Sequence, residues 1–114
     1  MVEARLATAL EAGAIVRRAE ANGDFATVLR KGDPDRGALL LVVTSRGRHV
    51  AILERMLNLA GSYGWQKVGP DDSADSEKVR DFLAKRTRFD ADIWLIELDI
   101  AQAERFIAET TAAG

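Results

Sequence analysis

The chain has 114 residues, a formal net charge of −2, 47% hydrophobic and 30% charged residues, and no cysteine. A chain of this length has material for one hydrophobic core, and its composition is that of an ordinary folded domain. The composition excludes disulfides, thiolate nucleophiles and cysteine-based metal sites, and the charge argues against broad attraction to nucleic acid or to an anionic membrane.

The sequence carries no membrane or export signal that we can identify. The longest apolar run, residues 38–43, is far shorter than the ~20 residues of a membrane-spanning helix. The first residues include Glu3 and no long apolar core, so no signal peptide is expected. We therefore expect one cytoplasmic domain over residues 1–114 without a membrane partner, and the lack of cysteine fits a reducing compartment.

The first predicted element is a helix. Apolar or small side chains recur at helical spacing between Leu6 and Val16, and Asn22-Gly23 supplies residues that tolerate positive φ at a helix end. A strand is predicted at residues 25–30. Residues 31–37 then form a turn, because proline fixes φ and the flanking aspartates bond nearby backbone amides.

Two further strands are predicted after this turn. Residues 38–44 are apolar without a charge, which indicates a central strand covered on both faces. Residues 49–58 fit a helix through Val50, Leu53 and Leu57, but they also fit a strand. The hairpin-like reversal at residues 45–48 favours the strand.

The second half of the chain predicts two strands and two helices. A short strand at residues 63–68 is followed by an acidic stretch at 71–76, which suits the positive N-terminus of a second helix. Residues 93–98 form the fifth strand. Asp99 and Gln102 have the spacing of a capping box and open the last helix.

These elements predict an α+β domain with a mainly antiparallel meander sheet of about five strands and three helices, in the order α-β-β-β-β-α-β-α. If the first strand runs upward, three reversals and an ascending second helix bring residues 32–37 and 86–92 together at one end of the sheet. The opposite end gathers charges of both signs, which neutralise each other there. These are Arg17, Arg18, Arg46, Arg48, Asp71, Asp72 and Asp75.

The first of these ends is a candidate ligand site. Its arginines would anchor an anionic group, and its aspartates would hold a cation or transfer a proton. The candidates are Arg30, Asp33, Asp35, Arg36, Arg86, Asp90 and Asp92. The alternative is that Asp33-Pro34-Asp35 is a tight turn chosen for backbone reasons, and this alternative is favoured. We expect no metal and no cofactor.

No residue is predicted to be catalytic. Glu97 and Asp99 follow a buried strand as in metal-dependent nucleases, but no lysine lies between them to support an attacking water. His49 has no serine or aspartate partner close in sequence. The glycines at residues 61–64 match neither a phosphate loop nor a dinucleotide fingerprint.

An interaction surface is the remaining candidate. Trp65 and Trp94 are predicted core residues, but Trp65 would mark a partner surface if the helices leave it uncovered. Arg17 and Arg18 would contribute to such a surface, while nucleic acid is disfavoured by the overall charge. We expect a non-catalytic binding or protein-interaction module, whose partner is a second copy or another protein.

Three segments together resemble a small bacterial family, domain of unknown function fourteen ninety-one. They are residues 29–40, Gly64-Trp65 and residues 90–97, with Arg17-Arg18 before them. The resemblance runs from about Arg5 to Glu97 and implies a compact cytoplasmic α+β protein. It implies nothing about an activity, because none is assigned to the family. The family often has proline where Ala91 stands, so the turn here is less suited to be a rigid binding element. The family also often has a shorter tail, and the longer tail of this chain suggests an added packing or oligomer surface.

Overall fold

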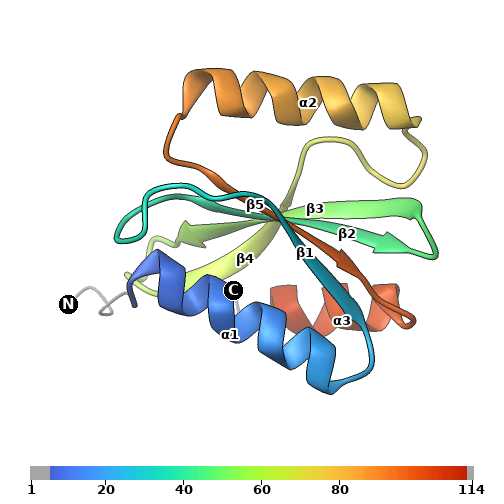
Figure 1. The fold of residues 1–114 in the computed structure, drawn as a ribbon, viewed down its shortest axis with the longest axis horizontal. Coiled ribbons are helices and arrows are strands. Elements are labelled where there is room, and N and C mark those ends of the chain that lie inside the picture. The colour runs from blue at the N-terminus through green and yellow to red at the C-terminus, as the bar shows by residue number, and fades with distance from the viewer. Residues whose placement is uncertain (1–5, 113–114) are drawn as a thin grey trace.

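The computed structural model describes residues 6–112 as three helices and one five-stranded sheet, in the predicted order and α+β class (Figure 1). The elements are α1 Thr8–Ala21, β1 Phe25–Arg30, β2 Leu39–Ser45, β3 Arg48–Leu57, β4 Tyr63–Val68, α2 Ser76–Phe89, β5 Trp94–Asp99 and α3 Ala103–Ala112. Residues 1–5, on which the expectation of no signal peptide rests, lie outside the described residues. Between residues 6 and 112, no helix is both long and apolar enough to cross a bilayer.

The sheet is mixed, which corrects one detail of the predicted meander. Its strand order is β1-β5-β2-β3-β4. β5 lies between β1 and β2, antiparallel to the first and parallel to the second, while β2, β3 and β4 form an antiparallel meander. The cause is α2, because this helix carries the chain back along the sheet and β5 therefore starts at the same end as β2.

The ambiguous stretch at residues 49–58 is a strand, as the turn before it predicted. β3 pairs with β2 on one side and with β4 on the other. Arg46 and Gly47 have φ of 52° and 80°. Left-handed backbone at both central residues is the geometry of a type I′ hairpin turn, whose twist matches that of the flanking strands.

Two helical layers cover the two faces of the sheet (Figure 1). Alternate side chains of the central strand β2 point to opposite faces, so Leu39 and Leu41 belong to one core and Leu40 to the other. The larger core lies under α1 and α3 and includes Ile96 and Ile107. The smaller core lies under α2. Six consecutive buried residues in β2 confirm that residues 38–44 form a central strand.

Candidate functional site

The two segments proposed as a ligand site meet at one end of the sheet, as the strand directions predicted. The backbone N–H of Asp33 donates to the carbonyl oxygen of Asp92 over 3.0 Å. The indole Nε1 of Trp94 donates to the carbonyl oxygen of Asp33 over 2.8 Å, and the Trp94 N–H donates to Ala38. We call residues 30–38 and 90–94 together the clasp.

The aspartates of the clasp hold their own turns. Asp33 Oδ2 accepts hydrogen bonds from the N–H groups of Asp35 and Arg36, at 3.1 and 2.7 Å. Asp90 Oδ1 accepts one from the N–H of Asp92 at 3.0 Å. These are the local side-chain to backbone bonds that aspartate makes in turns. The turn interpretation therefore accounts for Asp33 and Asp90.

Two glycines allow the halves of the clasp to touch. A Cβ added to Gly32 would lie 2.0 Å from the carbonyl oxygen of Asp92, and one added to Gly37 would lie 2.3 Å from the same atom. No side chain fits at either position without moving the backbone. The Gly32 to Gly37 motif thus serves close packing between loops.

The clasp also caps helix α1. The N–H groups of Thr8 and Ala9 donate to the carbonyl oxygens of Asp35 and Pro34, at 3.3 and 2.8 Å. The buried hydroxyl of Thr8 donates to the carbonyl oxygen of Gly37 at 2.9 Å. The N-cap residue Ala7 has no side chain for this purpose. The loop carbonyls satisfy N–H groups that a helix N-terminus otherwise leaves unpaired.

The arginines of the clasp region are held by protein groups. Arg30 Nη2 donates to the carbonyl oxygen of Ala91 at 2.8 Å. Arg86 forms two hydrogen bonds of 2.9 Å with the carboxylate of Glu54, joining α2 to β3. The bonds to Glu54 raise the pKa of Arg86. Arg86 is thus a structural residue in this arrangement.

Three of the predicted ligand-binding residues remain at the surface of the clasp. These are Asp35, Arg36 and Asp92, which are exposed. Across residues 6–112, histidine and carboxylate side chains nowhere gather in a group of three that could hold a metal ion. Of the seven predicted residues, Arg30, Asp33, Arg86 and Asp90 bond the protein through side-chain atoms.

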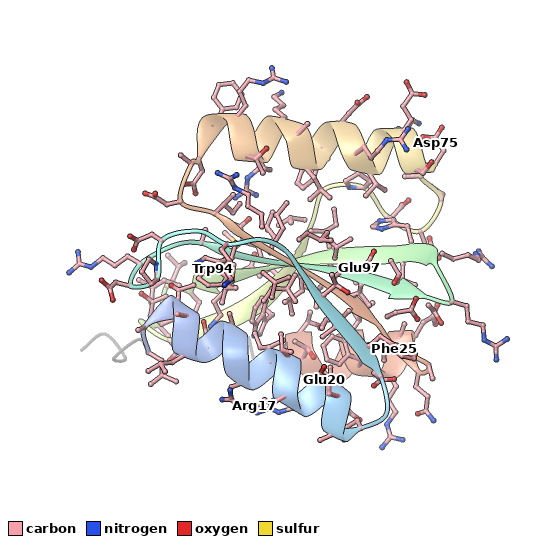
Figure 2. All side chains as sticks on the ribbon, viewed as in Figure 1. Arg17, Glu20, Phe25, Asp75, Trp94 and Glu97 are labelled. Carbon is pink, nitrogen blue, oxygen red and sulfur yellow. The ribbon has the colours of Figure 1, made fainter. Side chains whose placement is uncertain are left out.

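Of the predicted interaction residues, Arg18 and Trp65 line the same groove. The groove separates α1 from α3 and has a volume of about 380 Å³, with Leu41 and Leu98 in its floor and Phe106 in its wall. Trp65 is half-buried against the larger core, so it fits the prediction of a core residue better than that of a partner surface. Arg17 lies on the outer side of α1, where its guanidinium folds back over Gly13 (Figure 2).

Trp65 also belongs to a cluster that the sequence did not reveal. The guanidinium of Arg55 lies 5.5 Å from the ring centre of Tyr63 and 5.6 Å from that of Trp65. Its Nε lies 3.1 Å from Glu11 Oε2 on α1. Cation–π contacts and an ion pair therefore join β3, β4 and α1.

The acidic and histidine candidates at the other end of the sheet have structural partners. Asp99 accepts hydrogen bonds of 2.9 Å from the N–H groups of Gly47 and Arg46, and one of 3.2 Å from the Thr44 hydroxyl. These bonds, that of Gly47 foremost, lower the pKa of Asp99. His49 Nε2 lies 2.9 Å from the carbonyl oxygen of Pro70.

The edge strand β1 is a surface that the sequence did not identify. The strand was predicted, but its place at the end of the sheet was not. Phe25 is 73% exposed, Leu29 49% and Val28 38%. Figure 2 shows Phe25 near the start of β1 and well apart from α2.

The fold and the partners of its charged residues define a small α+β domain in which the motif residues mainly build the structure. The chain matches the family model described as "Protein of unknown function (DUF1491)" over residues 6–108, so it belongs to that family. This confirms the resemblance seen in the sequence.

Solved structures of bacterial proteins have the same fold. A crystal structure of a DUF1491 family protein from Caulobacter crescentus CB15 is 28% identical, with a TM-score of 0.76, and the alignment covers 85% of this chain and 90% of that one. An NMR structure of a DUF1491 family protein from the same organism is 29% identical, with a TM-score of 0.73 and coverage of 89% and 91%.

A third similar structure is more distant in sequence. The solution structure of protein Atu0922 from A. tumefaciens is 24% identical, with a TM-score of 0.71 and coverage of 85% of this chain and 87% of that one. This likeness shows the fold alone. No curated protein matches the chain.

Proposed function

We propose that this protein is a non-catalytic protein-interaction module whose partner adds a strand to the free edge of β1. Within residues 6–112, one side of the β1 backbone is available because the sheet order ends at this strand. An edge strand presents unpaired N–H and C=O groups that template pairing with another chain. The exposed side chains of Phe25, Val28 and Leu29 would then supply apolar contact.

The comparison of the two sheet edges supports this choice. Proteins protect edge strands with charged residues, prolines or covering helices. Both edge strands contact a helix, β4 with α3 and β1 with α1, but β4 also carries Lys67. Residues 25–29 contain no charge and no proline. A bulge, which is another feature that protects edge strands, lies between Val28 and Arg30 and leaves residues 25–28 as the regular part of β1.

The alternative function, ligand binding at the clasp, has less support. Asp33 and Asp90 bond backbone amides. Arg86 bonds Glu54, and Arg30 bonds a backbone carbonyl. A ligand that took over these bonded atoms would have to break the bonds, and breaking them leaves groups without partners. The proposal includes a cytoplasmic location, which the lack of cysteine fits.

Site-specific photo-crosslinking in living cells tests the proposal. A photoreactive amino acid replaces Thr27, the exposed residue in the middle of β1, and in the control it replaces Gln66, an exposed residue of β4. We expect a defined adduct, identified by mass spectrometry, at position 27 and none at position 66. Equal adduct patterns at the two positions, or no adduct at position 27, would contradict the proposal.

A further inference from the structure

We propose that the partner of β1 is a second copy of this chain, paired antiparallel with its own β1 about a two-fold axis at Thr27. This inference rests on the proposed function and names its partner. Identical edge strands pair most simply about a two-fold axis, since the same surface then serves both copies. The five strands of each copy would join into one continuous sheet.

The charges at the two ends of β1 favour an antiparallel pair. Asp24 precedes the strand, whereas Arg30 and Lys31 end and follow it. In an antiparallel pair the acidic end of one copy meets the basic end of the other. A parallel pair would instead place like charges side by side, which is unfavourable.

The directions of the side chains limit where the centre of the pair can lie. Ala26 packs against the core under α1, and it pairs with Leu98, which belongs to that core. Val28 pairs with Ile96 and shares this face, whereas Thr27, opposite Glu97, is on the other face. Residues opposite each other in a sheet share a face, so the two-fold axis lies at a residue and not between two residues. An axis at Thr27 places Thr27 opposite Thr27 and Ala26 opposite Val28.

The register centred on Thr27 places the axis within the regular part of the strand, residues 25–28. It places Ala26 opposite Val28 of the second copy and brings Phe25 next to Leu29 of that copy. It also brings Asp24 near the basic end formed by Arg30 and Lys31. The two most exposed apolar residues of the strand, Phe25 and Leu29, would thereby cover each other.

The dimer should be weak and concentration-dependent. One short strand supplies the whole contact, and interfaces of low area belong to transient complexes. Self-association should therefore be measured by sedimentation velocity from micromolar to millimolar protein. A single monomeric species across this range would overturn the inference.

Disulfide trapping tests the register directly, because the chain has no cysteine and every introduced thiol is unique. In a T27C variant the two thiols would face each other at a separation that a disulfide can span in a sheet. The control is Q66C on the opposite edge strand. Under mild oxidation we expect T27C to form covalent dimer about tenfold faster than Q66C. Equal rates would overturn the inference.

Folding of the variants is checked separately. Both positions are exposed, so the reduced variants should melt at the wild-type temperature.

A charge variant provides a second measurement. K31E places an acid near Asp24 of the second copy and should weaken the dimer about threefold to tenfold at low salt. The loss should shrink at high salt because charges on the surface are screened. An unchanged dissociation constant would contradict the antiparallel arrangement.

The two proposals fail in different ways. If position 27 crosslinks only to a different protein and T27C forms no dimer faster than Q66C, self-pairing is wrong and the interaction module stands. If position 27 gives no adduct in cells and T27C stays monomeric, both proposals are wrong. A crosslink of position 27 to the same residue in a second copy supports both.

Discussion

The indole N–H of Trp94 donates a hydrogen bond of 2.8 Å to the backbone carbonyl of Asp33, 61 residues away in the chain. This bond joins the two motifs that carry the family resemblance, the turn at residues 31–37 and the segment at 90–94. The same turn supplies carbonyl groups to the first N–H groups of α1. The motif residues therefore fix the relative positions of β1, β5 and α1.

Replacing Trp94 with phenylalanine tests the importance of this bond. W94F keeps an aromatic ring in the buried site but leaves the Asp33 carbonyl without its indole donor. We expect a loss of about 1–3 kcal/mol in the free energy of unfolding, measured by urea denaturation. The control is W65F, whose ring lies in the groove between α1 and α3. A smaller loss in W94F than in W65F would contradict the proposed role.

The glycines of the clasp give a second prediction. G32A and G37A would each drive a Cβ into the carbonyl oxygen of Asp92. We expect each variant to lose about 2–3 kcal/mol of stability or more. The control is G13A inside α1, where the added Cβ meets only the flexible end of Arg17. G13A should gain about 0.5–1 kcal/mol, because alanine favours a helix. Similar melting temperatures in the three variants would refute this account.

The sequence predicted the elements of the fold because their signals are local. Continuous apolarity identified β2, and the Arg46-Gly47 turn resolved β3 as a strand. Counting chain reversals placed residues 32–37 beside residues 86–92, since that inference needs only strand directions.

Other features depend on which strands become neighbours. The insertion of β5 between β1 and β2 is set by where α2 crosses the sheet. The exposed edge of β1 has an apolar pattern that would suit a central strand equally well. Glu11 and Arg55 pair only after α1 has packed on the sheet. Periodicity and turn signals contain none of this information.

The ion pair between Glu54 and Arg86 predicts measurable coupling across the smaller core. The two side chains are partly buried, with Arg86 29% and Glu54 17% exposed. A double-mutant cycle with E54Q and R86Q should give a coupling of about 1 kcal/mol, above that of a fully exposed pair. The cycle is measured by urea denaturation. The exposed pair of Arg105 and Glu109 on α3 serves as the control and should give less. Equal coupling energies for the two pairs would contradict the prediction that partial burial strengthens the pair of Glu54 and Arg86.

The last prediction concerns acid stability and Asp99. Its pKa lies below the ordinary value of 3.8, chiefly because the Gly47 N–H donates to the carboxylate. A depressed pKa in the folded state means that ionised Asp99 stabilises the protein above pH 3.8. This stabilisation is lost as the pH falls through the folded-state pKa.

Urea midpoints measured from about pH 6 to about pH 2.5 check the prediction. D99N should lower stability by about 0.5–1 kcal/mol at neutral pH, since these hydrogen bonds are exposed and weakly held. It should also reduce the fall in stability below pH 3.8 compared with wild type. D35N removes one exposed carboxylate from the clasp and serves as the control for the change in net charge. If D99N and wild type lose stability in parallel on acidification, the carboxylate does not hold the β2–β3 turn as the structure indicates.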